Sequence, residues 1–308
     1  RIWPNKKIRW CFHDDNADLQ LRGLWNAAID LWAELKDHGF SYEEVSRSVC
    51  RSQSQRSTVL HIYYNAGGRL LSTLGIPAID EEANRDDPDP ILGPYSHLSD
   101  MQGIGMNDVN ANVAHELGHV WGLHHEHQNP QYWKVSVSDI GGAWAIPTFA
   151  NYPKRFATAN FDCQNLKDYQ QAVARVQAKI DAATDPTERD GLTVDLTRLC
   201  TSHYVAQKYR FSGSEWIPLT HLNNLVMDAE FDENSIMLYP SSAGATGLGA
   251  NRATVMVYND GSRIQENLVP SPMDINRLVS LYGTPASSVP KALHNSKSSR
   301  LRSVFSKS

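Results

Sequence analysis

The stretch His115-Glu-Leu-Gly-His-Val-Trp-Gly-Leu-His-His125 decides how the rest of the chain is interpreted. It follows the pattern H-E-x-x-H-x-x-G-x-x-H, in which five residues stand at fixed offsets. A helix has about 3.6 residues per turn, so His115 and His119 lie on one face. Gly122 allows the chain to leave the helix and to bring His125 back toward that face. The spacing predicts that three imidazole rings meet at one point.

Three neutral imidazole nitrogens suit a zinc ion and leave a fourth coordination position open, as is typical of catalytic rather than structural zinc sites. Glu116 is rotated away from the ligand axis, where its carboxylate can act on a water molecule without binding the metal. The sequence therefore predicts one catalytic Zn²⁺ ion with the ligands His115, His119 and His125. A surface helix with solvated histidines is the alternative, but it does not explain the glycine and the third histidine.

Two neighbouring histidines need a separate interpretation. His124 could replace His125 as the third ligand by a shift of one residue, but the spacing of the motif favours His125. We expect His127 to lie beside the ligands or on the surface.

An apolar stripe supports a helix through the motif and should face away from the histidines. Asn107 or Asp108 is expected to cap its first turn. The stripe consists of Val109, Val113, Leu117 and Val120.

A second motif lies far downstream, in the stretch Glu233-Asn-Ser-Ile-Met-Leu-Tyr-Pro240. With the long zinc motif followed by Glu126, it resembles the astacin family of metzincin zinc peptidases. The resemblance rests on Ser235, Met237 and Tyr239. It implies that Met237 lies beneath the metal, and that Tyr239 is an additional zinc ligand that moves to stabilise the transition state. It also implies that a buried amino terminus pairs with Glu126.

Three looser matches extend the resemblance over residues 3–283. Trp3-Pro4-Asn5 looks like the start of an astacin domain, and 59–64 with Gly67-Gly68 looks like the edge strand and its following turn. Residues 271–282 resemble the closing helix of the family. The cysteines stand at other positions than in the family, and extra residues fall between Cys163 and Thr220, which indicates a divergent branch.

The expected fold is α+β, a two-lobed metzincin-type peptidase with a twisted mixed sheet and an active-site helix. The peptidase domain is expected over 1–288, with an N-terminal lobe at 1–122 and a C-terminal lobe at 123–288. A helical insertion at about 163–205 should belong to the second lobe, and a basic disordered tail should follow at 289–308.

Hydrophobic periodicity predicts the main elements of the two lobes. Strands are expected at 8–12, 40–45 and 59–64, and helices at 21–35 and 166–180, with a further helical run ending near Cys200. Four cysteines allow three pairings. We favour Cys11–Cys50 within the first lobe and Cys163–Cys200 around the helical insertion.

Composition agrees with a secreted globular enzyme. The 308 residues are 41% hydrophobic, contain no long apolar run and carry a formal charge of −5, so we expect neither a membrane span nor nucleic-acid binding. The tail at 289–308 is basic, whereas the rest of the chain is acidic. We expect the tail to be disordered, and its anchoring to a polyanion is the alternative. An acidic loop at 81–89 could bind calcium, but a solvated loop is the simpler interpretation. The enzyme is expected to be a monomer.

These features predict a zinc endopeptidase with a peptide or protein substrate. Glu116 would be the general base, and Tyr239 would stabilise the oxyanion as the resemblance implies. Two alternatives remain: a gluzincin-like peptidase with a downstream glutamate as third ligand, and a catalytically silent zinc-binding interaction module.

Overall fold

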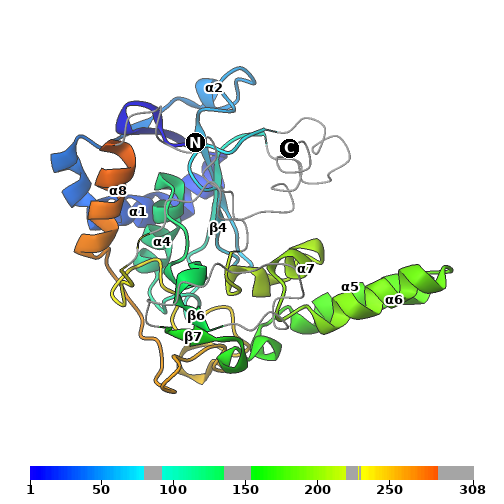
Figure 1. Ribbon diagram of the computed structural model, residues 1–308. Helices are drawn as coiled ribbons and strands as arrows, with labels where there is room; N and C mark the ends of the chain where they lie inside the picture. The colour runs from blue at the N-terminus through cyan, green and yellow to red at the C-terminus, as the bar shows by residue number, and fades with distance from the viewer. Residues whose placement is uncertain (80–91, 135–153, 220–227, 229, 284–308) are drawn as a thin grey trace.

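The computed structural model describes residues 1–79, 92–134, 154–219, 228 and 230–283 (Figure 1). The predicted acidic loop at 81–89 and the predicted basic tail at 289–308 lie outside these residues. The zinc motif, the Ser235–Tyr239 segment and all four cysteines lie inside them.

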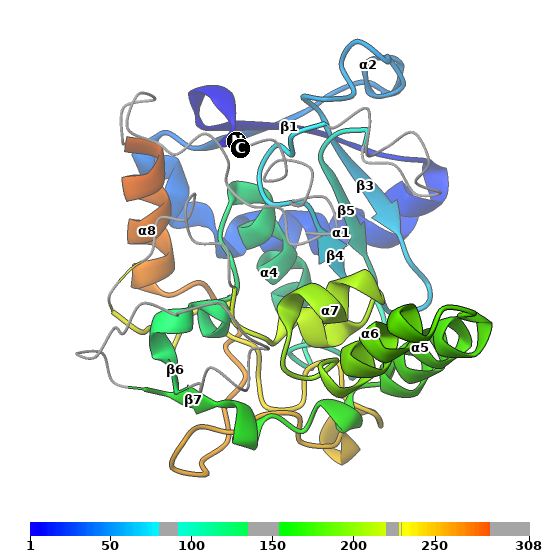
Figure 2. The same cartoon turned by 45° about the vertical axis from the view of Figure 1, so that its right-hand side comes forward.

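A five-stranded mixed sheet has the strand order β2-β1-β3-β5-β4 (Figure 2). Strands β2, β1, β3 and β5 run parallel to one another, and β4 pairs antiparallel with β5. The strands are β1 (Lys7–Phe12), β2 (Ser41–Glu44), β3 (Leu60–Tyr64), β4 (Leu71–Ser72) and β5 (Tyr95–Leu98). The predicted mixed sheet is therefore confirmed.

The prediction that 59–64 forms the edge strand is wrong. β3 lies between β1 and β5, and its residues Leu60 and Ile62 are fully buried. A strand with a neighbour on each side presents no unpaired backbone edge. Among the described strands the edge beyond β5 is β4, and its two residues are too few to produce a recognisable strand pattern.

Helices occupy much of the remaining described chain. They are α1 (Asp15–Leu31), α2 (Arg47–Cys50), α4 (Val109–Trp121), α5 (Tyr169–Ala182), α6 (Pro186–Thr197), α7 (His203–Lys208) and α8 (Pro272–Gly283). A small parallel sheet joins β6 (Trp133–Lys134) and β7 (Phe156–Ala157). No helix in the described ranges has both the length and the apolarity that a membrane crossing requires.

Helix α4 carries the zinc motif and is fixed at both ends. The Asp108 carboxylate accepts a hydrogen bond from Ala111 N at 2.8 Å, and Gly122 ends the helix in the left-handed region at φ 116°. These are the predicted cap and stop. The predicted stripe faces the core, where Val113, Leu117 and Val120 are fully buried and Val109 is half-buried in the first turn.

Helix α1 packs against α4 and holds it in place. Trp25 and Trp32 are fully buried, and the Trp32 indole N–H donates to Ala114 O of α4 at 2.9 Å. An indole with a satisfied N–H contributes a large apolar surface without leaving a polar group unpaired. The motif helix therefore rests on a rigid aromatic layer.

The described residues bury two large apolar clusters. The first joins β1, β3, α1, α4 and α8, and the second joins residues between Tyr132 and Ile264. Met237 belongs to the first cluster, whereas Tyr239 packs against the second. The segment that was predicted to complete the site therefore lies where the two clusters meet.

Both favoured disulfides are present, Cys11–Cys50 and Cys163–Cys200. The second disulfide encloses α5 and α6, which lie side by side and extend away from the sheet (Figure 1). Asp185 caps α6, and Pro186 occupies its first turn. The predicted helical hairpin is therefore confirmed.

Candidate metal centre

His115, His119 and His125 come together as the motif predicts. One nitrogen from each ring can be chosen so that all three lie within 4.8 Å of one another, and His119 Nε2 lies 3.0 Å from His125 Nε2. All three side chains are buried. The predicted set of three ligands is therefore confirmed as one cluster.

Each of the three rings is held through its Nδ1 atom. His115 Nδ1 donates to Ile236 O at 2.7 Å, His119 Nδ1 to Leu123 O at 2.7 Å, and His125 Nδ1 to Gln128 Oε1 at 2.9 Å. A proton on Nδ1 leaves the Nε2 lone pair free. The supporting bonds thus select the tautomer that can bind a metal.

The cluster fits a zinc ion. His115 Nε2 is buried and has no hydrogen-bond partner among the described residues. Burial lowers the pKa of His115 to about 4, and burial together with neighbouring histidines lowers the pKa values of His119 and His125 well below the usual value. The three rings are therefore neutral at pH 7, as nitrogen ligands of zinc must be.

Glu116 lies beside the cluster but is not one of its members. Its Oε2 atom is buried without a hydrogen-bond partner among the described residues. Burial raises the pKa of the Glu116 carboxyl to about 8, a hydrogen bond from Ser72 lowers it, and Glu215 raises it further. A carboxyl group with one free oxygen therefore lines the same cavity as the three rings.

Tyr239 and Met237 flank the rings. The Tyr239 ring stacks against His115 and has its centroid 4.1 Å from that of His125. Burial raises the pKa of the Tyr239 phenol well above its usual value, so the hydroxyl keeps its proton. Met237 packs under the helix, and a Cβ atom at Gly118 would lie closer to its sulfur than contact allows. Gly118, at a variable position of the zinc motif, therefore packs closely against Met237.

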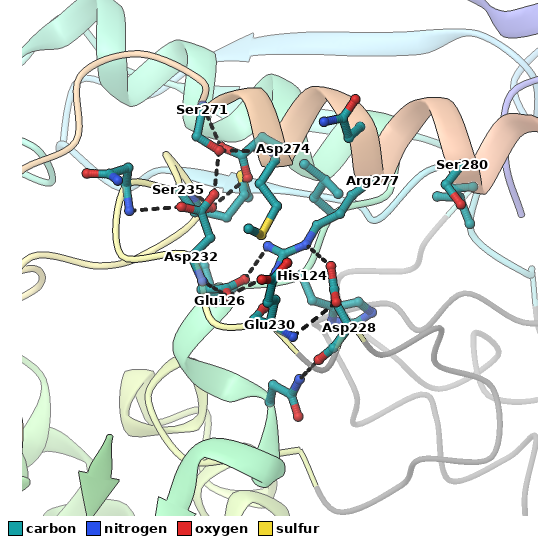
Figure 3. A pocket seen from close by; sticks show the side chains of 18 of the residues that line it. His124, Glu126, Asp228, Glu230, Asp232, Ser235, Ser271, Asp274, Arg277 and Ser280 are labelled. Atoms are coloured by element: carbon teal, nitrogen blue, oxygen red, sulfur yellow. Dashed lines mark hydrogen bonds and ion pairs between the residues drawn. The ribbon is translucent and has the colours of Figure 1, made fainter. Parts of the chain in front are cut away.

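The other two histidines are separated from the ligands by geometry. His125 belongs to the cluster and lines the cavity above it, whereas His124 lines only the cavity behind it (Figure 3), so the structure supports the register that favours His125. His127 is fully buried, stacks on His125 and donates from Nε2 to Glu215 O at 2.8 Å. Of its two predicted positions, the one beside the ligands is correct and the surface position is wrong.

Gln128, Glu215 and Trp216 complete the surroundings of His125 and were not predicted. Gln128 Nε2 donates to Ser214 O at 2.8 Å, and Glu215 Oε2 lies 3.7 Å from His125 Nδ1. Trp216 packs edge-on against Tyr239. Gln128 could have been noticed because it follows His125 by three residues, but no local pattern marks Glu215 or Trp216.

A cavity of about 660 Å³ opens over the cluster. Its lining includes Leu71 and Ser72 of β4 together with Glu215 and Tyr239. Basic side chains also line it, including Arg69, Lys167, Arg175 and Arg210. The base of the helical hairpin contributes Lys167 and Arg175, so the hairpin is not remote from the site.

Glu126 pairs with a residue of α8. Arg277 Nη1 donates to Glu126 Oε2 at 2.6 Å (Figure 3). The Arg1 amino group donates to Ile76 O at 2.7 Å instead of contacting Glu126. A guanidinium group matches the two oxygens of a carboxylate, so Arg277 is the charge partner of Glu126 in the described residues. The pairing of Glu126 with a mature amino terminus stays a prediction.

No family model and no curated protein matches the chain. Among solved structures, the chain is similar to high choriolytic enzyme 1, a hatching enzyme zinc-protease from Oryzias latipes (medaka fish), with 13% identity and a TM-score of 0.43 over 92% of this chain and 94% of that one. It is also similar to myroilysin, with 14% identity and a TM-score of 0.42 over 92% of this chain and 96% of that one. Because these scores are low, the function has to be argued from the chain's own residues.

Proposed function

We propose that the protein is a zinc-dependent endopeptidase that hydrolyses bonds in peptide or protein substrates. The observation that carries the proposal is the convergence of three buried imidazoles beside the free oxygen of Glu116. When bound, zinc supplies a Lewis acid that polarises a carbonyl group and acidifies a water molecule. The residues of the chain supply the proton transfers and the orientation of the substrate.

Glu116 is the proposed general base. Its carboxylate is adjacent to the ligand cluster without belonging to it, and Ser72 binds it from the edge strand. Burial favours the protonated carboxyl near pH 7 in the metal-free protein, and a bound cation beside it would favour the ionised form. Once ionised, the free Oε2 atom can accept a proton from the attacking water and return it to the leaving amine. This double role requires a carboxylate, because an amide cannot take up the proton.

Tyr239 is the proposed donor to the oxyanion. Its ring lies against His115 and His125. Tyr239 also lines the cavity in which the reacting carbonyl group of the substrate is proposed to bind. A neutral phenol donates a hydrogen bond to a developing negative charge. We retain the hypothesis that Tyr239 is also a zinc ligand when no substrate is bound.

The proposed substrate path follows β4. This short strand is at the sheet edge and lines the cavity together with Glu116. An extended peptide can pair with such an edge through its main chain, independently of its side chains. In this arrangement, an internal peptide bond of the bound substrate would lie next to Glu116. Cleavage of internal bonds is what defines an endopeptidase.

We further propose one peptidase domain over 1–288, with lobes meeting near residue 122, and secretion of the protein. The two clusters that meet at the site support a two-lobed arrangement. Two disulfides support an oxidising compartment, because such bonds persist mainly outside the cytosol.

Glu116→Gln tests the proposal directly. The variant should retain bound zinc and lose at least about 100-fold in peptide hydrolysis, because the proton acceptor is removed. Zinc content and cleavage of a peptide library should be measured together, with Glu188→Gln on α6 as the exposed control. Near-normal hydrolysis by Glu116→Gln would exclude the mechanism.

The same assay separates the alternatives. Cleavage by the unmodified protein should stop with a zinc chelator and return when zinc is added. Zinc binding without cleavage of any peptide would indicate the catalytically silent module. The gluzincin-like alternative requires zinc to remain when His125 is replaced.

A further inference from the structure

Helix α8 carries two charged residues that bind chain segments next to the ligand histidines. Asp274 and Arg277 are three positions apart, so they lie on one side of the helix (Figure 3). They line a cavity of about 850 Å³ that is shared with His125 and Met237. Neither residue lines the cavity in which the substrate is proposed to bind.

Asp274 holds the segment that orients His115. The buried carboxylate accepts hydrogen bonds from Ser235 Oγ at 2.6 Å, Ile236 N at 2.9 Å and Ser271 N at 3.0 Å. Ile236 O is in turn the acceptor for His115 Nδ1. The backbone of a single residue, Ile236, therefore links α8 to the first ligand.

Arg277 holds the segment that presents His125. Its Nη1 and Nη2 atoms bind the Glu126 carboxylate at 2.6 Å and 3.3 Å, and its Nε binds Asp228 Oδ2 at 3.0 Å. The same guanidinium donates to Glu230 O at 2.7 Å. Such a bidentate pair fixes direction as well as distance, which a lysine ammonium does not.

Glu126 transmits this restraint to the ligand loop. It follows His125 directly, its backbone N–H donates to Met237 O at 3.0 Å, and its Oε1 accepts from Asp232 N at 2.8 Å. The side chain is almost completely buried. A buried carboxylate without a counter-charge is strongly unfavourable, so the loop depends on the guanidinium for its present conformation.

We propose that Arg277 is a positioning residue of the metal centre, which acts through Glu126 to hold His125 in place while Asp274 holds His115 through Ile236. Helix α8 thereby sets the distance between ligands contributed by α4 and by the loop after it. The effect on turnover rests on the proposed peptidase function, but the effect on metal affinity does not.

Arg277→Met and Glu126→Gln test the proposal as a pair. If the ion pair positions His125, both variants should lower zinc affinity by about 10–100-fold, as loss of a group supporting a ligand does. If only charge matters, the variants should move in opposite directions: removing a cation should strengthen zinc binding, and removing an anion should weaken it. Zinc affinity is measured by competition with a coloured chelator.

The double variant Glu126→Gln/Arg277→Met completes the cycle. Its loss of affinity should be close to that of either single variant, because both act through one interaction. Losses that multiply would show that Arg277 acts independently of Glu126, and the proposal would be wrong. The double variant also leaves no buried unpaired charge, so it tests the proposal if a single variant fails to fold.

A spectroscopic measurement distinguishes positioning from general stability. The visible absorption of the cobalt-substituted protein should change in Arg277→Met and should not change in the control Arg22→Met, which removes an ion pair of α1 with Asp18 and Glu44. Lower melting temperature with unchanged cobalt spectrum and zinc affinity would overturn the proposal. If the unmodified protein cleaves no peptide, these two measurements still decide it.

Turnover supplies the last comparison. Arg277 does not line the proposed substrate cavity, so Arg277→Met should lower kcat more than it raises KM, and Arg277→Lys should recover part of the loss. An effect confined to KM would place Arg277 in substrate binding and would contradict the positioning role.

Discussion

At the residue scale, the chemistry depends on which nitrogen of each histidine is free. The Nδ1 protons of His115 and His119 are bound by backbone carbonyls, whereas that of His125 is bound by the side chain of Gln128. A backbone acceptor cannot be removed by substitution, but a side-chain acceptor can. His125 is therefore the ligand that depends most on neighbouring side chains.

The choice between His124 and His125 gives the first prediction. His125→Ala should lose most of its bound zinc, because one of three converging nitrogens is removed. His124→Ala should keep near-normal zinc, since His124 is not a member of the three-histidine cluster. Metal analysis of the two purified variants decides the matter, and equal losses would contradict the assigned register.

Tyr239 gives the second prediction. Tyr239→Phe keeps the ring against His125 but removes the hydroxyl. If the hydroxyl acts mainly in the transition state, kcat should fall by about 10–1000-fold with little change in KM or in zinc content. Unchanged turnover would reduce Tyr239 to a packing residue of the second cluster.

At the element scale, the motif helix could be predicted well because its signals are local. Asp108, Gly122 and the apolar stripe all lie within one short stretch, and the helix begins and ends where they indicate. The edge strand could not be predicted, because β4 has only two residues and its partner β5 is distant in the sequence. The cavity wall at Glu215 was also missed, since its approach to His125 arises only from tertiary packing.

The hairpin of α5 and α6 gives the third prediction. Lys167 and Arg175 of the hairpin line the substrate cavity, but its tip extends away from the sheet (Figure 1). Replacing 180–190 with a short Gly/Ser turn should leave zinc content and small-peptide cleavage unchanged. Cleavage of a folded protein should change, because a projecting element affects the access of large substrates.

The control for this replacement is the intact Cys163–Cys200 bond, which should be verified by non-reducing peptide mapping. Loss of zinc from a shortened variant that keeps its circular dichroism spectrum would show that the hairpin tip supports the metal centre. The division between an accessory tip and a functional base would then be wrong.

At the scale of the whole molecule, the metal centre joins parts that are far apart in the sequence. His115 belongs to α4, its acceptor Ile236 precedes Met237, and both are tied to α8 through Asp274. The Trp3 indole N–H donates to Val120 O, and the Tyr282 hydroxyl donates to Trp121 O. The beginning and the end of the described chain therefore meet at the end of the motif helix.

This arrangement predicts that zinc stabilises the entire fold. A ligand that binds only the native state at 100 times its dissociation constant adds about 2.7 kcal/mol to the free energy of unfolding. For a chain of 308 residues, the corresponding rise in Tm is roughly 4 °C. Melting curves of the metal-free protein with and without added zinc measure the difference.

The matched control is His119→Ala, which removes one ligand from the middle of the cluster. Added zinc should raise the Tm of the unmodified protein and leave that of His119→Ala nearly unchanged at the same zinc concentration. A similar rise in both proteins would mean that zinc stabilises the molecule through another site. The three histidines would then not account for the coupling between metal and fold, even if they support hydrolysis.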